Sequence, residues 1–252
     1  MSTTALDGEA WLRRWDAQQQ LHIPHREDRF AAITDVLAAF GGEGPRVIDL
    51  GSGPGSLSAR VLRRLPGAEI VALDADPVLL EIGRSAFADQ PRIRFVDADL
   101  RGEWGYALPV PGPFDAAVST TALHWLELPD ILHLYAQLAV LLRVGGVFVN
   151  GDRFEFDHDQ PTIAAAASAL GTPEPEPVPG GAETWETWWA AAAADPALTE
   201  AMAERTRRRH EHPHDHARHA LEFHRAALLS AGFAEVGTVW QRLTDRVLVA
   251  IR

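Results

Sequence analysis

A carboxylate and three glycines stand at alternate positions early in the chain, as Asp49, Gly51, Gly53 and Gly55. Glycines let main-chain N–H groups and the start of a following helix approach a ligand closely. A dinucleotide-binding fingerprint would need its third glycine at position 56, where the chain has Ser56. The carboxylate of Asp49 suits a cationic ligand and would repel a pyrophosphate. The spacing therefore favours a cationic, nucleotide-type ligand. A glycine turn that merely connects a strand to a helix is the alternative.

Further carboxylates follow the next two apolar runs of the chain. Asp74 ends the first run, and Asp97 and Asp99 follow the second. Ligands of open α/β sheets bind beyond the carboxyl ends of the strands, so we expect Asp74, beside Ala75, to accept both ribose hydroxyls. Asp76 is expected to cap the following helix instead. One of the later pair is expected to accept from an adenine amino group, with a solvated acidic turn as the alternative.

Two stretches resemble motifs of one enzyme family. The turn after Asp49 resembles the first motif of the class I S-adenosylmethionine-dependent methyltransferases. The sequence FDAAVSTTALHWL, over 114–126, looks like the fourth motif, and its ALHW part is similar to small-molecule members such as the trans-aconitate methyltransferases. The resemblance implies S-adenosyl-L-methionine as cofactor and S-adenosyl-L-homocysteine as product. It also implies methyl transfer to a small molecule, and we expect an oxygen or carbon atom of a small acid or aromatic metabolite.

The resemblance also implies roles for individual residues along the cofactor. Asp49 is expected to bind the ammonium of the methionine part, and Asp99 the adenine amino group. Leu100 would flank the base, and the strand end at Ser119 would border the sulfonium. The complete set of expected cofactor residues is Asp49, Gly51, Ser52, Gly53, Gly55, Asp74, Ala75, Asp99, Leu100 and Ser119.

Reactive and aromatic side chains, two of them within the ALHW stretch, are the candidates for an acceptor pocket. His124 is expected to take part in catalysis. Trp125 could offer its ring face to the cationic methyl group, although a lone tryptophan packs as commonly in a core. Arg153, just past the fifth strand, could hold an acceptor carboxylate through paired hydrogen bonds. Trp185, in a tryptophan-rich helical pattern, is expected to line the same pocket.

Histidines alternate along the segment HEHPHDH, from position 210 to 216. In an extended segment alternate side chains point the same way, so the imidazoles would converge. We expect His210 to contact the substrate, and His212 and His214 to accept protons. A metal-assisted reaction with zinc, iron or nickel is one alternative, and a solvated turn ahead of a helix is the other. No metal ligand is assigned.

Composition narrows the class of protein. The chain has 252 residues, a formal net charge of −12, no cysteine and no lysine. The negative charge would repel a phosphate backbone, so nucleic acid is not an expected partner. Neither a signal-peptide pattern nor a long apolar run is present in the sequence, so no membrane partner is expected. We expect a cytoplasmic monomer or homodimer that acts on a small-molecule substrate.

The candidate residues require a sheet that brings strand ends together. Alternating apolar runs and helical patterns predict one doubly wound, Rossmann-like α/β domain. The family resemblance implies seven strands in the order 3-2-1-4-5-7-6. The predicted parts of the single domain (1–252) are an N-terminal helical cover (1–42), a cofactor-binding half (43–152), a helical insertion or lid (153–216), and a last helix with strands 6 and 7 (217–252).

Two other functions compete with methyl transfer. A dehydrogenase would need a nicotinamide cofactor, against which the glycine spacing argues. A non-catalytic cofactor-binding protein would keep the glycine turn without a closed acceptor pocket.

Overall fold

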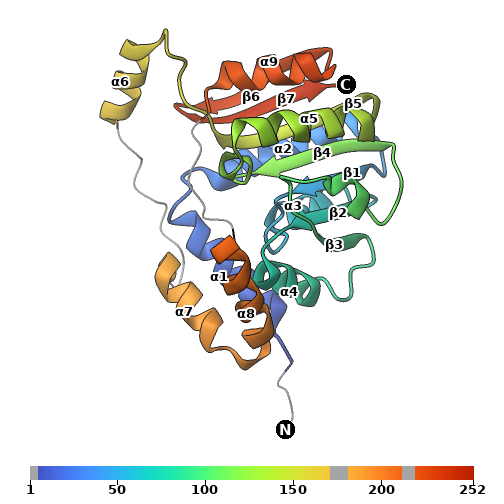
Figure 1. The fold of residues 1–252 in the computed structure, drawn as a ribbon, viewed down its shortest axis with the longest axis vertical. Coiled ribbons are helices and arrows are strands. Elements are labelled where there is room, and N and C mark those ends of the chain that lie inside the picture. The colour runs from blue at the N-terminus through green and yellow to red at the C-terminus, as the bar shows by residue number, and fades with distance from the viewer. Residues whose placement is uncertain (1–4, 171–180, 212–218) are drawn as a thin grey trace.

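A seven-stranded sheet forms the centre of the computed structural model, which describes residues 5–170, 181–211 and 219–252. Its strand order is β3-β2-β1-β4-β5-β7-β6, with β7 antiparallel to both of its neighbours (Figure 1). This order and the Rossmann-like α/β class confirm the prediction. The strands are β1 (Arg46–Leu50), β2 (Glu69–Asp74), β3 (Ile93–Asp97), β4 (Phe114–Thr120), β5 (Leu142–Arg153), β6 (Glu235–Arg242) and β7 (Asp245–Ile251).

Helices cover both faces of the sheet (Figure 1). α2 and α3 bury apolar side chains such as Phe30 and Leu57 against one face. α5 and α9 bury Leu134, Leu138 and Leu228 against the other. The helices and short 3₁₀ turns are α1 (Gly8–Gln20), α2 (Arg26–Phe40), α3 (Ser56–Arg64), α4 (Pro77–Ala86), η1 (Trp104–Ala107), η2 (Leu123–Trp125), α5 (Leu128–Leu141), α6 (Pro161–Leu170), α7 (Trp185–Ala194), η3 (Pro196–Leu198), α8 (Thr199–Glu211) and α9 (Leu221–Ala231).

The start of α4 follows the capping chemistry expected from the sequence. The Asp76 side chain accepts a hydrogen bond from the backbone N–H of Val78 at 3.0 Å. Pro77 occupies the first turn of the helix, where its missing N–H costs nothing. This cap fixes the chain just after β2, where the loop faces the candidate site.

The insertion after β5 divides into two parts among the residues described. α6 stands away from the body of the molecule (Figure 1), and it buries none of its residues. α7 and α8 instead pack beside α1 and α4, where the ring of Trp188 lies 5.2 Å from Trp11 and 5.0 Å from Trp15. The insertion, α1 and α4 thus share a small core of their own. No helix in the described ranges has the length and apolar character needed to cross a bilayer.

A buried polar contact joins α5 to α9. The hydroxyl of Tyr135 lies 2.6 Å from Nδ1 of His224, and both residues are buried. Burial lowers the pKa of His224 to about 4, so its imidazole is neutral at physiological pH. The neutral ring can therefore accept the hydrogen bond of the tyrosine hydroxyl.

We expect Tyr135→Phe to lower the free energy of unfolding by about 1–3 kcal/mol, because it leaves a buried nitrogen of His224 without its partner. Urea unfolding followed by circular dichroism measures this change. Tyr106→Phe is the matched control, because Tyr106 is 89% exposed and should show no change. Equal stability of the two variants would contradict a stabilising role for the buried pair.

Candidate active site

A cavity of about 760 Å³ lies at the carboxyl ends of β1 to β4. We call it the large cavity. Its walls come from the glycine turn, the loops after the strands, α1 and the α7–α8 insertion. A volume of this size falls within the range of ligand pockets, about 300–1,000 Å³. The expected site residues that line it are Asp49, Gly51, Ser52, Gly53, Asp74, Ala75, Asp99, Leu100, His124, Trp125 and Trp185.

The glycine turn after β1 has the backbone shape that only glycine adopts easily. Gly51 and Gly53 have φ of +67° and +55°, and both line the large cavity. A Cβ at Gly51 would collide with the Cβ of Ala122, which follows β4. The turn is therefore close to the end of β4, and any side chain at Gly51 would disturb the wall between them.

Asp49 offers an oxygen that no described residue satisfies. Its Oδ2 accepts from the Ser58 hydroxyl at 2.6 Å, while its buried Oδ1 has no hydrogen-bond partner. Burial raises the pKa of Asp49 to about 7, although the bond from Ser58 works against this rise. A cationic ligand donor placed against Oδ1 would relieve both the missing bond and the cost of burying the charge.

Asp74 joins the glycine turn to the loop after β2. Its carboxylate accepts from the backbone N–H groups of Gly53 at 2.7 Å and Asp76 at 2.8 Å. Burial raises the pKa of Asp74 to about 6. Each carboxylate oxygen has a further lone pair, so the group retains capacity to accept from ligand hydroxyls.

The acidic turn after β3 is paired with arginines in this structure. Asp99 accepts from Arg101 at 2.7–3.1 Å, and Asp97 accepts from Arg208 of α8 at 2.7 and 2.8 Å. Arg208 also donates to the carbonyl of Ala75 at 2.8 Å. α8 is thereby bonded to the loops after both β2 and β3, which places the insertion over this end of the large cavity.

His124 is held by a buried carboxylate on the opposite side of the large cavity. Its Nδ1 lies 2.8 Å from Oδ1 of Asp152, which is 2% exposed near the end of β5. Burial alone would raise the pKa of Asp152, but the attraction and hydrogen bond of His124, with the charge of Arg29, lower it below its usual value. An ionised Asp152 fixes the orientation of the imidazole through this contact.

Comparison with known proteins identifies the central part of the chain. Residues 47–146 match the family model described as "Methyltransferase domain". The chain is 35% identical over 134 residues to a trans-aconitate 2-methyltransferase of Azoarcus sp., covering 53% of this chain and 48% of the relative. It is 37% identical to the enzyme of the same name from Methylobacterium radiotolerans, covering 52% and 47%. The matched region thus spans about half the length of these relatives.

Solved structures agree on the fold. A methyltransferase structure from Methanococcus maripaludis superposes with a TM-score of 0.53 at 17% identity, covering all of this chain and 97% of the other. An O-methyltransferase structure from Nostoc punctiforme gives 0.59 at 17% identity, covering 99% and 62%. Residues 47–146 thus carry a methyltransferase domain, and the solved structures share its fold. The family and fold imply S-adenosylmethionine as its cofactor.

The methyltransferase domain presents groups that fit this cofactor. The unpartnered Oδ1 of Asp49 is a matching acceptor for an ammonium, and the bare backbone at Gly51 and Gly53 leaves room for a ligand. Leu100 is buried and lines the large cavity beside Asp99, as a residue that flanks a base would. The individual roles of these residues stay predictions.

Three of the expected site residues do not line the large cavity of the methyltransferase domain. Gly55 starts α3 and packs against the rings of Phe87 and Phe95. Ser119 is fully buried and donates to the carbonyl of Leu50 at 2.8 Å, so it joins β4 to β1. Arg153 is exposed as the last residue of β5, whereas Asp152 beside it is buried. This placement does not support the predicted contact of Arg153 with the acceptor.

The histidine run lies almost wholly outside the described residues, which include neither His212 nor His214. His210 falls within the backbone of α8. The extended conformation predicted for the start of the run is therefore wrong at that position, because the preceding arginine-rich sequence continues the helix. Among the residues that the structure describes, no group of three or more metal-binding side chains comes together.

The aromatic candidates lie where the sequence indicated. Trp125 is 40% exposed and lines the large cavity, so it is not a core residue. Trp185 also lines it, while its neighbour Trp188 is fully buried. The tryptophans of α7 therefore serve both the small core and the cavity wall.

Sequence reasoning missed several residues of the site. Asp152 belongs to the pattern of a buried strand, and only its contact with His124 reveals it. The arginines of α8 were not among the expected site residues, yet Arg205 and Arg208 bond the loops after β2 and β3. The one available signal was the crowding of three consecutive arginines in an insertion beside a ligand site.

Proposed function

We propose that the protein transfers the methyl group of S-adenosylmethionine to an oxygen atom of a small carboxylic acid and releases S-adenosylhomocysteine. One observation carries this proposal. The large cavity joins the glycine turn and Asp49 to His124 and Trp125, so cofactor and acceptor groups share one space. A non-catalytic cofactor-binding protein would not need the acceptor groups, His124 and Trp125, in the wall of the same cavity.

Methyl transfer mainly requires that the acceptor oxygen, the methyl carbon and the sulfur are aligned. When bound, S-adenosylmethionine would supply an electrophilic methyl group, and its sulfur would keep the electron pair of the broken sulfur–carbon bond. Asp49, Asp74 and Asp99 would hold the cofactor, while Trp125 and Trp185 would exclude water from the acceptor side. Correct placement of two reactants contributes a large part of such a rate enhancement.

The charge of the cavity wall favours an anionic acceptor. Five arginines and five aspartates line the large cavity, although the whole chain carries a net charge of −12. A bound cationic cofactor would make this balance positive, which attracts a carboxylate. The matched relatives are named for trans-aconitate, a small polycarboxylic acid. The arginines are Arg26, Arg101, Arg205, Arg207 and Arg208.

A hydroxyl group is the second candidate acceptor, and the His124–Asp152 pair favours it. An imidazole held at Nδ1 by an ionised carboxylate is the usual arrangement of a general base. A carboxylate acceptor needs no base, and His124 would then donate a hydrogen bond to it. The two acceptors therefore require opposite protonation states of His124.

We expect turnover with small carboxylic acids, among them trans-aconitate, when the protein is incubated with S-adenosylmethionine. Mass spectrometry of the products identifies the methylated atom, and release of S-adenosylhomocysteine gives the rate. Phenols and alcohols of similar size, without a carboxyl group, serve as the comparison panel. Turnover of the phenols and alcohols alone would show that the acceptor is a hydroxyl group and not a carboxylate. Equal release of S-adenosylhomocysteine with every compound tested would contradict the proposal.

A cytoplasmic location, a monomeric or homodimeric state and the absence of a nucleic-acid partner stay predictions from the sequence. The division of the single domain into cover, cofactor half, insertion and final strands is likewise our proposal.

A further inference from the structure

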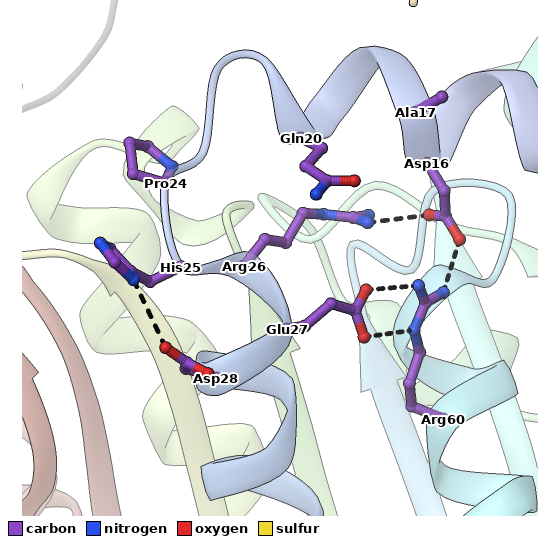
Figure 2. Close-up of a pocket in the computed structure, with 9 residues that line it drawn as sticks. All are labelled: Asp16, Ala17, Gln20, Pro24, His25, Arg26, Glu27, Asp28 and Arg60. Atoms are coloured by element: carbon purple, nitrogen blue, oxygen red, sulfur yellow. Dashed lines mark hydrogen bonds and ion pairs between the residues drawn. The ribbon is translucent and has the colours of Figure 1, made fainter. Parts of the chain in front are cut away.

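A second, smaller cavity of about 200 Å³ lies beside the start of α2. Figure 2 shows the residues that line it, from α1, the turn before α2, α2 itself and α3. Arg26 lines both this cavity and the large one, so this residue stands where the two meet. No role follows for Arg26 from the cofactor motifs.

A network of charges fixes the position of Arg26. Asp16 of α1 accepts from Nη1 of Arg26 at 2.9 Å and from the Ser56 hydroxyl at 2.6 Å. Its other oxygen accepts from Nη1 of Arg60 at 2.5 Å, and Arg60 in turn donates to Glu27 (Figure 2). The network ties the N-terminal helices to the first turn of α3, directly after the glycine turn.

Arg26 retains donors that its surroundings do not use. The residue is 7% exposed, and its guanidinium lies 4.5 Å over the ring of Phe30. Its only hydrogen bond to a described residue is the one from Nη1 to Asp16. Nε and Nη2 are left to donate to a ligand, and a guanidinium presents such donors in the geometry that matches a carboxylate.

Asp49 supplies a negative charge that complements the positive charge of Arg26, and both residues are linked to the first turn of α3. Ser56 bonds the network that holds Arg26, and Ser58 bonds Asp49. Both serines lie in the first turn of α3, so Arg26 and Asp49 are linked to the same turn, and both residues line the large cavity. A cationic donor group and an anionic acceptor group at one place suit a zwitterion, such as the α-amino-acid end of a ligand.

We propose that Arg26 binds the carboxylate of the methionine part of the cofactor, while Asp49 binds its ammonium. This assignment rests on the proposed function, because it presumes that S-adenosylmethionine occupies the large cavity. Asp16 acts as a positioning residue, since it holds the guanidinium without facing the ligand carboxylate. The N-terminal helices thereby become part of the cofactor site.

The test removes the carboxylate from the ligand and the guanidinium from the protein. S-adenosyl-3-thiopropylamine is S-adenosylhomocysteine without its carboxylate, and it keeps the ammonium. Calorimetric titration of the wild-type protein should show roughly 10- to 100-fold tighter binding of S-adenosylhomocysteine than of the amine. In Arg26→Met this preference should shrink to within about threefold of equality.

Arg60→Met provides the matched control. Arg60 shares Asp16 with Arg26 and lines only the smaller cavity. We expect this variant to keep the wild-type preference for S-adenosylhomocysteine, even if loss of the network lowers its stability. Urea unfolding of both variants separates a general loss of structure from a loss of recognition.

The remaining outcomes each have one meaning. If Arg26→Met still prefers S-adenosylhomocysteine over the amine as strongly as the wild type does, the assignment is overturned. The assignment is also overturned if the only effect of Arg26→Met is a higher KM for the acceptor acid. Failure of the wild-type protein to bind either ligand would instead overturn the proposed function. A preference lost equally in both variants would show that the network as a whole, and not Arg26, shapes the site.

Discussion

Asp49→Asn is expected to weaken S-adenosylhomocysteine binding by roughly 30-fold or more at pH 8, because it removes the charge that we propose binds the ligand ammonium. The side chain keeps its size, so the glycine turn should keep its shape. Calorimetric titration measures the affinity. Asp89→Asn is the control, because Asp89 is exposed and lies outside the large cavity. Equal affinities of the two variants would remove Asp49 from the cofactor site.

Asp49→Asn should also stabilise the ligand-free protein. Burial raises the pKa of Asp49 to about 7, well above the value of about 3.9 expected for an unfolded chain. Between these values the folded state binds more protons than the unfolded state, so stability falls as pH rises from about 4 to about 7. Asp49→Asn should therefore be more stable than the wild type at pH 8, and the gain should be much smaller at pH 4.

Binding should depend on pH for the same reason. The ammonium needs the ionised carboxylate, so affinity for S-adenosylhomocysteine should fall as pH drops below about 7, where Asp49 takes up a proton. The Ser58 hydroxyl bonds the ionised form, and Ser58→Ala should therefore move the midpoint to higher pH. Affinity that stays constant from pH 5 to pH 8 would contradict this account.

His124→Ala and Asp152→Asn are expected to lower kcat/KM by roughly 100-fold each. The first removes the imidazole that we propose contacts the acceptor, and the second removes the charge that orients this imidazole. The affinity for S-adenosylhomocysteine should stay unchanged in both. The double variant should lose little more than either single variant, because the two residues act as one unit. Additive losses would separate the roles of the two residues.

The pH profile of this pair distinguishes the acceptors. A carboxylate acceptor reacts as its anion and would accept a hydrogen bond from a protonated His124, so the rate at saturating cofactor should fall toward high pH. A hydroxyl acceptor requires the neutral imidazole as base, and the rate should then rise toward high pH. Saturating cofactor is essential, because ionisation of Asp49 affects its binding. His133→Ala is the control, since that histidine lies on the outside of α5 beside Glu103.

Much of the fold was predictable because its signals are local. Apolar runs followed by glycine or aspartate mark strand ends, and parallel strands bring those ends to one edge of the sheet. Asp49, Asp74 and Asp99 therefore meet as expected. Asp76 was correctly predicted as a helix cap, because the signal lies within three residues of the helix that it starts.

The rest of the site depends on contacts that sequence spacing does not reveal. Asp152 and Arg153 are neighbours in β5, and only the register of the strand decides that Asp152 points toward His124 and Arg153 away. Arg26 becomes a site residue because α1 brings Asp16 against α3. Such pairings between distant elements leave no periodic trace in the sequence.

Calorimetric titration of the wild-type protein with S-adenosylhomocysteine at pH 8, beside a titration with a nicotinamide dinucleotide, tests the central claim most directly. We predict saturable binding of S-adenosylhomocysteine at one site per chain, and no binding of the dinucleotide, since Asp49 would oppose its pyrophosphate. Binding of the dinucleotide without binding of S-adenosylhomocysteine would contradict the account.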